Sequence, residues 1–293
     1  DMGAGDDSIS IMATGSNGTP TIANLDLAKL DGGAGTDTLK FEESGSNTTE
    51  LTLTTGGATN FENIVGTSGS ETIKGDANNN ILTGGNGGED TIYGYDGDDV
   101  LVGNGTSVNM LSDPNQSYAV FGDGTFGLTW VDNQYNDQQD SYWNNSDYTD
   151  GNTLYGGAGD DALFGGYGDD TLDGGTGSDI LTGGNGNDTF VIRTGDGSTN
   201  VEDADIVTDF GENGTDLIGL DNGLTFDQLT IEQGTGTYAT KKNNINNVLI
   251  KVTATGEVLL VLHAGGGLSA SDITDLDFTE VDIPDSSKPL EDN

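Results

Sequence analysis

The sequence predicts an all-β fold, a parallel β-roll or β-solenoid with a C-terminal β-rich cap. Three observations lead to this class: a nine-residue repeat over Gly156–Val191, an apolar residue in fixed phase with that repeat, and 49 glycines in 293 residues. The four copies read GGAGDDALF, GGYGDDTLD, GGTGSDILT and GGNGNDTFV. Such a fixed period predicts stacked coils, because one repeat cannot bury its own inner face and must pack on its neighbours.

Each copy combines Gly-Gly-x-Gly-x-Asp with a triplet whose middle residue is apolar. Glycines at the first, second and fourth positions allow backbone conformations that a Cβ atom forbids, so carbonyl oxygens can point into a tight turn. The triplet that follows, as in Ala162-Leu163-Phe164, forms a short strand with its central side chain inward. Each repeat is therefore half a coil, and two repeats complete one turn of the roll.

The aspartate at the sixth position indicates the ligand chemistry. In this register Asp161 lies above Asp179 on one edge of the roll, and Asp170 lies above Asp188 on the other. Acidic turns at a strand spacing of roughly 4.8 Å repel one another unless a cation lies between them. Calcium prefers about six to eight hard oxygen ligands, which carboxylates and turn carbonyls supply. We therefore predict several Ca²⁺ ions between successive turns.

Degenerate copies of the repeat extend the pattern toward the N-terminus. Four of them lie between residues 66 and 102, and their sixth-position residues are Glu71, Asn80, Asp90 and Asp99. Two lone copies come earlier, with Asp7 and Asp37 in that position, and we expect them to stack on the strands around them. Asn keeps an oxygen but lacks the charge, so weaker or empty sites are expected around Asn80 and Asn152.

The periodicity divides the chain into six regions. Residues 1–65 form a strand-rich lead-in with the two lone repeats, residues 66–102 a first roll, and residues 103–150 an aromatic-rich insertion that breaks the period. Residues 151–192 form the second roll, residues 193–280 a cap, and residues 281–293 a polar tail. One short helix is expected in the cap, at Ser269–Leu276, with Ser269 or Ser271 as its N-cap.

The charge balance predicts how the chain folds and where it works. There are 50 acidic against 8 basic residues, a formal charge of −42, and no cysteine. Self-repulsion opposes compaction, so we expect a disordered calcium-free chain that folds on binding calcium and unfolds in acid, where the ligands are protonated. Millimolar calcium occurs outside cells, which predicts an extracellular, secreted or cell-surface location. Nucleic acid is not an expected partner, and no apolar run reaches the ~18 residues of a membrane span.

Residues 66–192 resemble the calcium-binding β-roll of RTX (repeats-in-toxin) proteins, here of the adhesin or surface-protein type. The resemblance implies type I secretion of an unfolded chain, with a secretion signal in the 193–280 region, and folding on extracellular calcium. It also implies the ligands, which are sixth-position side chains and carbonyl groups of the glycine turns. The implied side-chain ligands are Asp161, Asp170, Asp179, Asp188, Asp99 and Asp90, then Asp7, Asp37, Asn80 and Asn152. The implied turn glycines are Gly156, Gly157, Gly159, Gly165, Gly166, Gly168, Gly174, Gly175, Gly177, Gly183, Gly184, Gly186, Gly84, Gly85 and Gly94.

Catalytic motifs do not appear in the sequence. It holds no HExxH, no GxSxG, no cysteine and a single histidine, His263, at the end of a strand-like run. We therefore predict a non-enzymatic structural or adhesive module whose partners are calcium and further copies of itself, as a homo-oligomer or surface polymer. The repeat already in progress at Asp1-Met2-Gly3 favours a long adhesin.

Two other functions stay open. The chain can be the C-terminal secretion and folding module of a larger secreted protease, lipase or epimerase. Ice binding by a flat solenoid face is the weaker alternative, because no regular threonine ladder is apparent at the strand positions.

The insertion at 103–150 also has two interpretations. It holds both tryptophans, Trp130 and Trp143, among several tyrosines and phenylalanines. These rings either form a small core of their own, which we favour, or bind a glycan or protein ligand.

Overall fold

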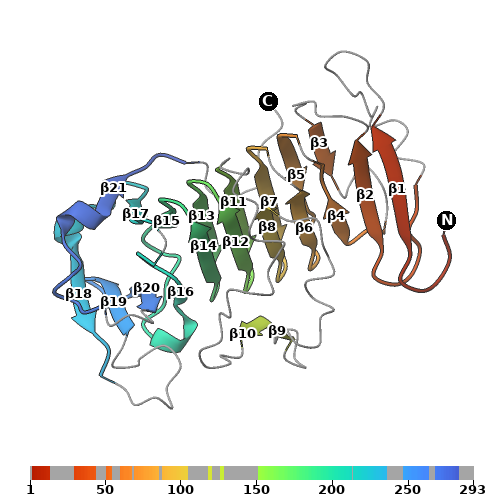
Figure 1. The fold of residues 1–293 in the computed structure, drawn as a ribbon. Helices are drawn as coiled ribbons and strands as arrows, with labels where there is room; N and C mark the ends of the chain where they lie inside the picture. Colours follow the sequence, from red (N-terminus) through yellow and green to blue (C-terminus); the bar gives the residue numbers. More distant parts are fainter. Residues whose placement is uncertain are drawn as a thin grey trace.

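The computed structural model describes residues 2–13, 30–43, 51–54, 60–67, 69–85, 88–104, 118–120, 126–128, 151–212, 214–235, 247–263 and 268–283. Within these residues the chain forms two long sheets whose strands lie side by side along one axis (Figure 1). Successive strands of the repeat region fall alternately into the two sheets, which is the path of a parallel β-roll. The predicted all-β parallel roll is thus confirmed.

The larger sheet, sheet 1, has eleven strands. In spatial order they are β1 (Ser8–Ala13), β2 (Thr38–Glu43), β4 (Asn63–Val65), β6 (Ile81–Gly85), β8 (Val100–Asn104), β12 (Ala162–Tyr167), β14 (Ile180–Asn185), β16 (Asp205–Val207), β20 (Val258–His263), β19 (Asn247–Val252) and β18 (Leu229–Gln233).

Sheet 2 has eight strands and lies opposite sheet 1. In spatial order they are β21 (Phe278–Glu280), β17 (Leu217–Leu220), β15 (Thr189–Ile192), β13 (Thr171–Thr176), β11 (Thr153–Ala158), β7 (Thr91–Asp96), β5 (Glu71–Lys74) and β3 (Leu51–Thr54). A separate antiparallel pair consists of β9 (Tyr118–Val120) and β10 (Phe126–Leu128).

The core is a double column of apolar side chains, one from each half-coil. Leu163 pairs with Leu181 in sheet 1 and Leu154 pairs with Leu172 in sheet 2, and all four are fully buried. The inward residue expected in each repeat is the one that the structure buries. Truncating one such leucine to alanine typically costs about 2–5 kcal/mol. Ile9, in the first described coil, is only partly buried because no described coil covers its outer side.

The two repeat blocks form one uninterrupted stack. β7 pairs with β11, and β8 pairs with β12, so Ile92 lies beside Leu154 and Leu101 beside Leu163. The register of the roll is therefore the same in β11 and β12 as in β7 and β8. Trp130 and Trp143 lie outside the described residues.

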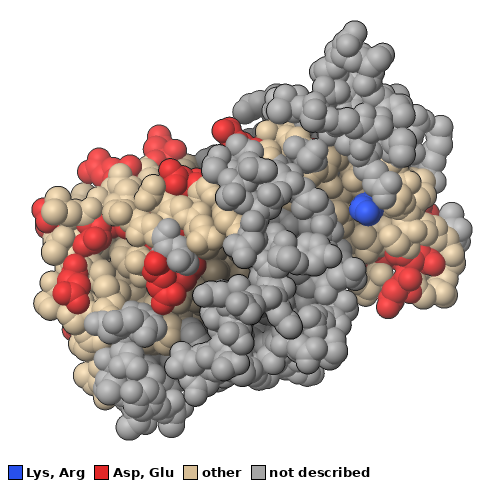
Figure 2. Space-filling model, viewed as in Figure 1, with Lys and Arg blue, Asp and Glu red and all other residues tan. Residues whose placement is uncertain are grey.

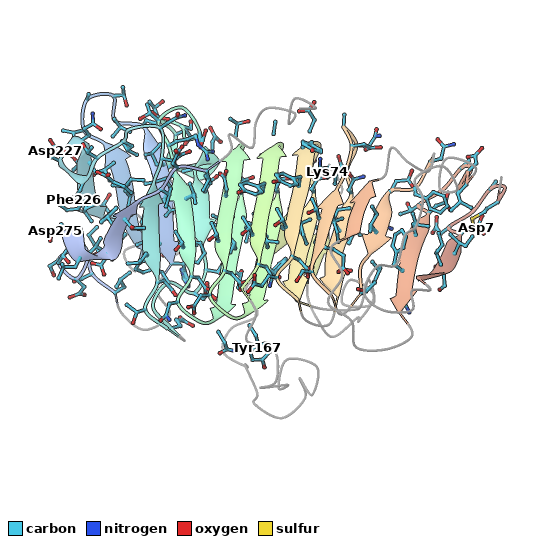
Figure 3. The ribbon with its side chains drawn as sticks, turned by 90° about the horizontal axis from the view of Figure 1, so that it is seen from above. Asp7, Lys74, Tyr167, Phe226, Asp227 and Asp275 are labelled. Atoms are coloured by element: carbon cyan, nitrogen blue, oxygen red, sulfur yellow. The ribbon has the colours of Figure 1, made fainter. Side chains whose placement is uncertain are left out.

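The cap begins by continuing both sheets. β16 pairs in parallel with β14, and β17 with β15, which places Val207 and Ile218 in the apolar column. After β20, sheet 1 turns antiparallel through β19 and β18. A further repeat cannot follow this reversal in register, so it closes the parallel stack. Figure 3 shows Asp7 at one end of the roll and Asp227 and Asp275 at the other.

The prediction of a short helix at Ser269–Leu276 is wrong. The Asp272 carboxylate instead accepts both the backbone N–H and the hydroxyl of Ser269, at 2.9 and 2.7 Å, which holds a turn. Only a single 3-10 turn, η5 (Asp275–Asp277), follows it, and its N-cap is Thr274. The chain then enters β21, because Phe278 pairs with Ile218 of sheet 2. Two similar 3-10 turns are η3 (Val201–Asp203) and η4 (Phe226–Gln228).

The outer face of sheet 2 carries a regular threonine ladder, contrary to the sequence-based expectation. The seventh repeat position is threonine in five adjacent strands, and each threonine pairs with the next in register. These residues are Thr72, Thr91, Thr153, Thr171 and Thr189. A flat ice-binding surface would also need small hydroxyl-bearing residues two positions further along each strand. Those positions are instead occupied by Lys74, Tyr93 and Asp173 in β5, β7 and β13.

No helix in the described part of the chain is long and apolar enough to cross a membrane.

Candidate calcium sites

The sixth-position side chains form a hydrogen-bonded ladder along each edge of the roll, which we call the inner ladder. Within it, Oδ1 of each aspartate accepts the backbone N–H of the ladder residue one coil earlier. Asp161 accepts from Asp99 at 2.7 Å, and Asp179 accepts from Asp161 at 2.8 Å. On the other edge, Asp188 accepts from Asp170 at 3.0 Å. The carboxylates are therefore aligned along the roll axis, as the repeat register predicts.

The inner ladder brings together every predicted sixth-position residue. On one edge its described members are Asp7, Asp37, Glu62, Asn80, Asp99, Asp161, Asp179 and Asp205. On the other edge they are Glu71, Asp90, Asn152, Asp170, Asp188 and Asp216.

Three of these members were not assigned from the sequence. Glu62 accepts the backbone N–H of Asp37, Asp205 that of Asp179, and Asp216 that of Asp188. Each of the three lies two residues before an inward apolar side chain, which is the signal that could have identified it. The glycine turn before each is degenerate, so the nonapeptide pattern alone did not reveal them.

The second carboxylate oxygen shows what the ladder lacks. Oδ2 of Asp99, Asp161 and Asp170 is buried and has no hydrogen-bond partner, and the same is true of Asp7 and Asp37. An ionised carboxylate oxygen without a partner in a buried position is strongly unfavourable. Such an atom requires either a proton or a cation, so the donor set fits a hard divalent ion such as calcium.

A carbonyl of the next coil lies on the same side of the turn as Oδ2 of Asp99, Asp161 and Asp170. A Cβ atom added to Gly156 would fall 2.4 Å from Asp161 Oδ2 and 2.5 Å from the carbonyl oxygen of Gly174. The first-position glycine therefore keeps open a space that carboxylate and carbonyl oxygens share. The first-position glycines with this surrounding are Gly84, Gly94, Gly156 and Gly165. At Gly174 and Gly183 the nearest atom is likewise the Oδ2 of the turn's own aspartate, at 2.3 and 2.1 Å.

The other turn glycines are required by backbone conformation. Gly157 has φ of 117° and Gly159 has φ of 142°, a region that side chains with a Cβ rarely adopt. Among the turn glycines expected from the sequence, those at the second and fourth positions that share a positive φ are Gly85, Gly157, Gly159, Gly166, Gly168, Gly175, Gly177, Gly184 and Gly186. Together these turns direct backbone carbonyls along the edge of the roll.

Burial and mutual repulsion act on the inner-ladder carboxyls. Burial raises the pKa of Asp170 to about 8, and those of Asp99 and Asp188 to about 7, while hydrogen bonds from the backbone oppose the rise. Burial, followed by the charges of Asp179 and Asp99, raises the pKa of Asp161 well above its ordinary value. The calcium-free roll therefore holds its ligands in surroundings that disfavour their charge, and a cation would reverse this.

A second row of side chains, the outer ladder, occupies the fifth repeat position. It runs in the opposite sense, because each side-chain oxygen accepts a backbone N–H from the coil that follows. Asp98 accepts from Asp160 at 3.1 Å, and Asp160 accepts from Ser178 at 2.9 Å. On the other edge, Asp169 accepts from Asn187 at 2.8 Å. Each turn is thus linked to both of its neighbours through side chains, and the sequence analysis missed this second row.

Of the inner-ladder residues that are not aspartate, Glu71 and Asn80 accept hydrogen bonds from within their own turns. Glu71 reaches back to Thr67, whose N–H and hydroxyl both donate to its carboxylate. Asn80 accepts the backbone N–H of Asp76 at 2.8 Å. In both turns, a side-chain oxygen of the ladder residue accepts a hydrogen bond from within the turn. The corresponding oxygen of Asp99 and Asp161, Oδ2, has no such partner.

No group of three or more His, Asp and Glu side chains among the described residues could hold a metal ion by side chains alone. Each turn of the roll supplies only a few carboxylate oxygens as possible calcium ligands. The remaining ligands must come from backbone carbonyls such as that of Gly174. Acidic side chains also gather on the exposed surface, at both ends of the face shown in Figure 2.

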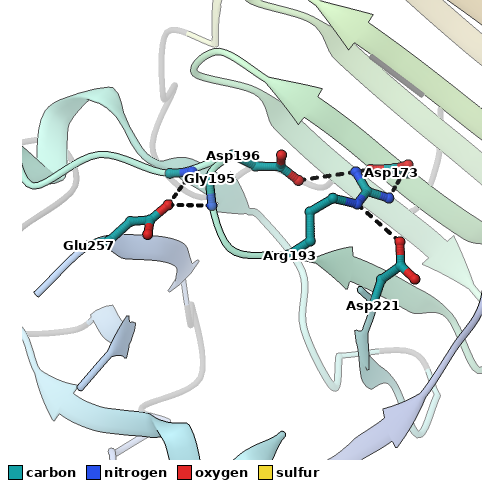
Figure 4. A network of polar contacts seen from close by, with 7 residues as sticks. Asp173, Arg193, Gly195, Asp196, Asp221 and Glu257 are labelled. Atoms are coloured by element: carbon teal, nitrogen blue, oxygen red, sulfur yellow. Dashed lines mark hydrogen bonds and ion pairs between the residues drawn. The ribbon is translucent and has the colours of Figure 1, made fainter. Parts of the chain in front are cut away.

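A buried ion cluster joins the roll to the cap (Figure 4). Arg193 is 3% exposed and its guanidinium contacts three carboxylates. It lies 2.8 Å from Asp173 of β13, 3.0 Å from Asp196 and 3.0 Å from Asp221, which follows β17. Nearby, Glu257 accepts the backbone N–H of Gly195 at 2.8 Å. The cluster therefore ties sheet 2 to the segment that leads into the cap.

A row of stacked tyrosine rings lies on sheet 2, on the strands β7 and β11. Tyr93 and Tyr155 are parallel, with centroids 4.8 Å apart, and Tyr95 lies 5.9 Å from Tyr93. The Lys74 ammonium lies 6.0 Å from the centre of the Tyr93 ring. Tyr95 takes the second-position glycine's place with φ of 82°, a strained conformation for a bulky residue.

His263 lies at the end of β20, with Nδ1 2.9 Å from Asn247 Oδ1, and burial lowers its pKa.

The fold and its turns define a parallel β-roll whose edges carry stacked, buried carboxylates suited to calcium. A family model described as the RTX calcium-binding nonapeptide repeat matches residues 65–87, 85–106, 148–181, 155–190 and 164–197. The chain therefore contains an RTX repeat region, as the sequence analysis expected, and RTX nonapeptide repeats bind calcium. A search of curated proteins found no match to the chain.

Proposed function

We propose that this chain is a non-catalytic, extracellular structural or adhesive module that folds when calcium binds, after type I secretion in an unfolded state. The observation that carries the proposal is the buried Oδ2 of Asp99, Asp161 and Asp170, which lacks any partner within the protein. A cation supplies that partner and offsets the repulsion along the ladder.

The charge of the chain supports folding outside the cell. A formal charge of −42 opposes compaction until cations are bound. Sites built from few carboxylates and many carbonyls are typical of weak binding in the high micromolar to millimolar range, which matches extracellular rather than cytosolic calcium. The same property keeps the chain unfolded before export.

Self-association at the cell surface belongs to the same proposal. Within the described residues β1 is the end strand of sheet 1 and pairs with β2. Strand pairing between the ends of two rolls is the contact by which we propose that copies assemble.

The test is a calcium titration of the purified chain, followed by far-ultraviolet circular dichroism and multi-angle light scattering, with magnesium as control. We expect a cooperative transition from coil to β-structure with calcium and none at equal magnesium. A rise in mass with calcium supports surface assembly, whereas a folded monomer overturns the assembly part of the proposal. Absence of any calcium-dependent transition overturns the function as a whole.

A further inference from the structure

Asn152 occupies an inner-ladder position where the two repeat blocks meet. It is 1% exposed and lies between Asp90 of the first block and Asp170 of the second. Its Oδ1 accepts the backbone N–H of Asp90 at 3.0 Å. Because that N–H is a donor, the amide atom facing it must be the oxygen, and the NH₂ group must point the other way.

The NH₂ group of Asn152 points at Asp170 Oδ1 and at the carbonyl oxygen of Gly165, the counterpart of the carbonyl that shares the space with Oδ2 in the aspartate turns. Nδ2 lies 3.1 Å from Asp170 Oδ1 and 3.5 Å from the carbonyl oxygen of Gly165. A Cβ atom added to Gly103 would fall 2.7 Å from this nitrogen and 2.6 Å from the Gly165 carbonyl. At the equivalent Gly156, the corresponding neighbours are Asp161 Oδ2 and the carbonyl of Gly174. Nδ2 thus stands where a carboxylate oxygen stands in the aspartate turns.

We propose that the Asn152 turn is a calcium-free joint, in which the amide hydrogens take the place of the ion between two coils. The donor hydrogens of Nδ2 face Asp170 Oδ1 and the Gly165 carbonyl across the space that a carboxylate oxygen enters in the aspartate turns, and their partial positive charge excludes a cation from that space. This inference rests on the proposed calcium binding by the aspartate turns. It concerns the inner-ladder step that spans the 103–150 insertion on the edge of Asp90 and Asp170, whereas on the other edge Asp99 and Asp161 span it.

Asn80 shows that the effect depends on orientation and not on asparagine alone. There the oxygen Oδ1, not the nitrogen, faces the first-position glycine, since a Cβ on Gly75 would fall 2.2 Å from it. That turn still presents an oxygen to the shared space. The Asn152 turn presents a hydrogen-bond donor, and so has no free ligand oxygen of its own at this point.

The joint has a structural consequence at the insertion. The Asp90, Asn152 and Asp170 step is held by direct hydrogen bonds at 3.0, 2.6 and 3.1 Å. Residues 62 positions apart in sequence are therefore brought into register without an ion between them. The two repeat blocks can dock through this step while calcium fills the aspartate turns on either side.

The experiment counts calcium ions per folded chain by native mass spectrometry at saturating calcium. Asn152→Asp restores the carboxylate, and we expect it to bind one calcium ion more than the unaltered chain. Asn187→Asp is the matched control, because it adds the same charge at an exposed outer-ladder position two coils along the same edge, and its ion count should not change. An unchanged count for Asn152→Asp, with the variant folded, overturns the joint.

Asn152→Ala provides a second test that requires no new site. If the turn holds no ion, the alanine variant keeps the full ion count, while its calcium midpoint for folding rises because hydrogen bonds are lost. A count lower by one would show that Asn152 is a ligand and would overturn the inference. Failure of the unaltered chain to bind calcium at all would instead refute the proposed function, so the two failures are distinguishable.

Discussion

Arg193 and Asp173 form a buried bidentate ion pair, with Nη1–Oδ1 at 2.9 Å and Nη2–Oδ2 at 2.8 Å. The pair bridges strand β13 and the start of the cap, and it lies within a cluster that contains two further carboxylates. Removing one partner of a buried pair leaves uncompensated charge in a poorly solvated position.

We therefore expect Arg193→Ala to destabilise the calcium-loaded roll by about 3–5 kcal/mol. Thermal unfolding at saturating calcium measures the effect. Lys251→Ala is the control, because Lys251 pairs with Glu232 on the surface at 24% and 50% exposure, and its loss should cost about 0–1 kcal/mol. Equal effects of the two substitutions would contradict a special role for the buried cluster.

Asp170 should set the calcium requirement for folding. Asp170→Asn keeps an acceptor for the Asn152 N–H, which donates to it at 2.6 Å, but removes the anionic ligand. We expect the calcium midpoint to rise several-fold in a circular dichroism titration. Asp169→Asn, one residue earlier on the exposed outer ladder, should leave the midpoint nearly unchanged. An unaltered midpoint for Asp170→Asn would show that the carboxylate is not a ligand.

Acid should act in opposite directions with and without calcium. The pKa of Asp170 is raised to about 8 and those of Asp99 and Asp188 to about 7, from an ordinary value of 3.8, mainly by burial. Because the folded-state pKa lies above the unfolded one, these groups favour the calcium-free roll fully only below pH 3.8, and that contribution is lost as pH rises through 7 to 8.

The calcium-free chain should thus be disordered at pH 8 and gain β-structure toward pH 4, followed by circular dichroism in a chelating buffer. With calcium present, protons compete for the ligands, so the calcium midpoint should increase as pH falls. Only this second effect agrees with the sequence-based expectation that acid unfolds the roll. A calcium-free chain that stays disordered down to pH 4 would contradict the first.

Gly156→Ala tests the space shared by carboxylate and carbonyl. The added methyl would lie 2.4 Å from Asp161 Oδ2 and 2.5 Å from the Gly174 carbonyl oxygen, so the turn must shift. We expect a loss of about 1–3 kcal/mol and a weaker calcium dependence of folding. Gly219→Ala is a milder comparison, since its nearest neighbours are side-chain methyls at 3.1 Å and beyond. If both variants behave alike in a calcium titration, the turn space is not where calcium binds.

The repeat phase was sufficient to predict the parallel roll, its inward residues and the stacking of Asp161 on Asp179. Each of these depends only on position within the nonapeptide, which the sequence displays directly. Asp205 and Asp216 could not be identified from the nonapeptide alone. The turn before Asp205 has no glycine, and the turn before Asp216 keeps only Gly211 and Gly214, although each aspartate lies two residues before an inward apolar side chain.

Features that depend on contacts between distant segments could not be read in the same way. The threonine ladder crosses the insertion between Thr91 and Thr153, where no fixed period connects the two. The orientation of the Asn152 amide is set by the N–H of Asp90 and the carboxylate of Asp170, and the Arg193 cluster by the path of the cap. The helix expected at Ser269–Leu276 gave way to side-chain hydrogen bonds and strand pairing that no local propensity reveals.

The opposed directions of the inner and outer ladders make every coil depend on both of its neighbours. The N–H of Asp161 donates to the coil after it, and its carboxylate accepts from the coil before it. The N–H of Asp160 donates to the coil before it, and its carboxylate accepts from the coil after it. A single coil that opens thus removes hydrogen bonds on two sides at once. The roll behaves as a one-dimensional lattice with nearest-neighbour coupling, in which a defect is unfavourable at two boundaries and ordered coils favour the ordering of the next.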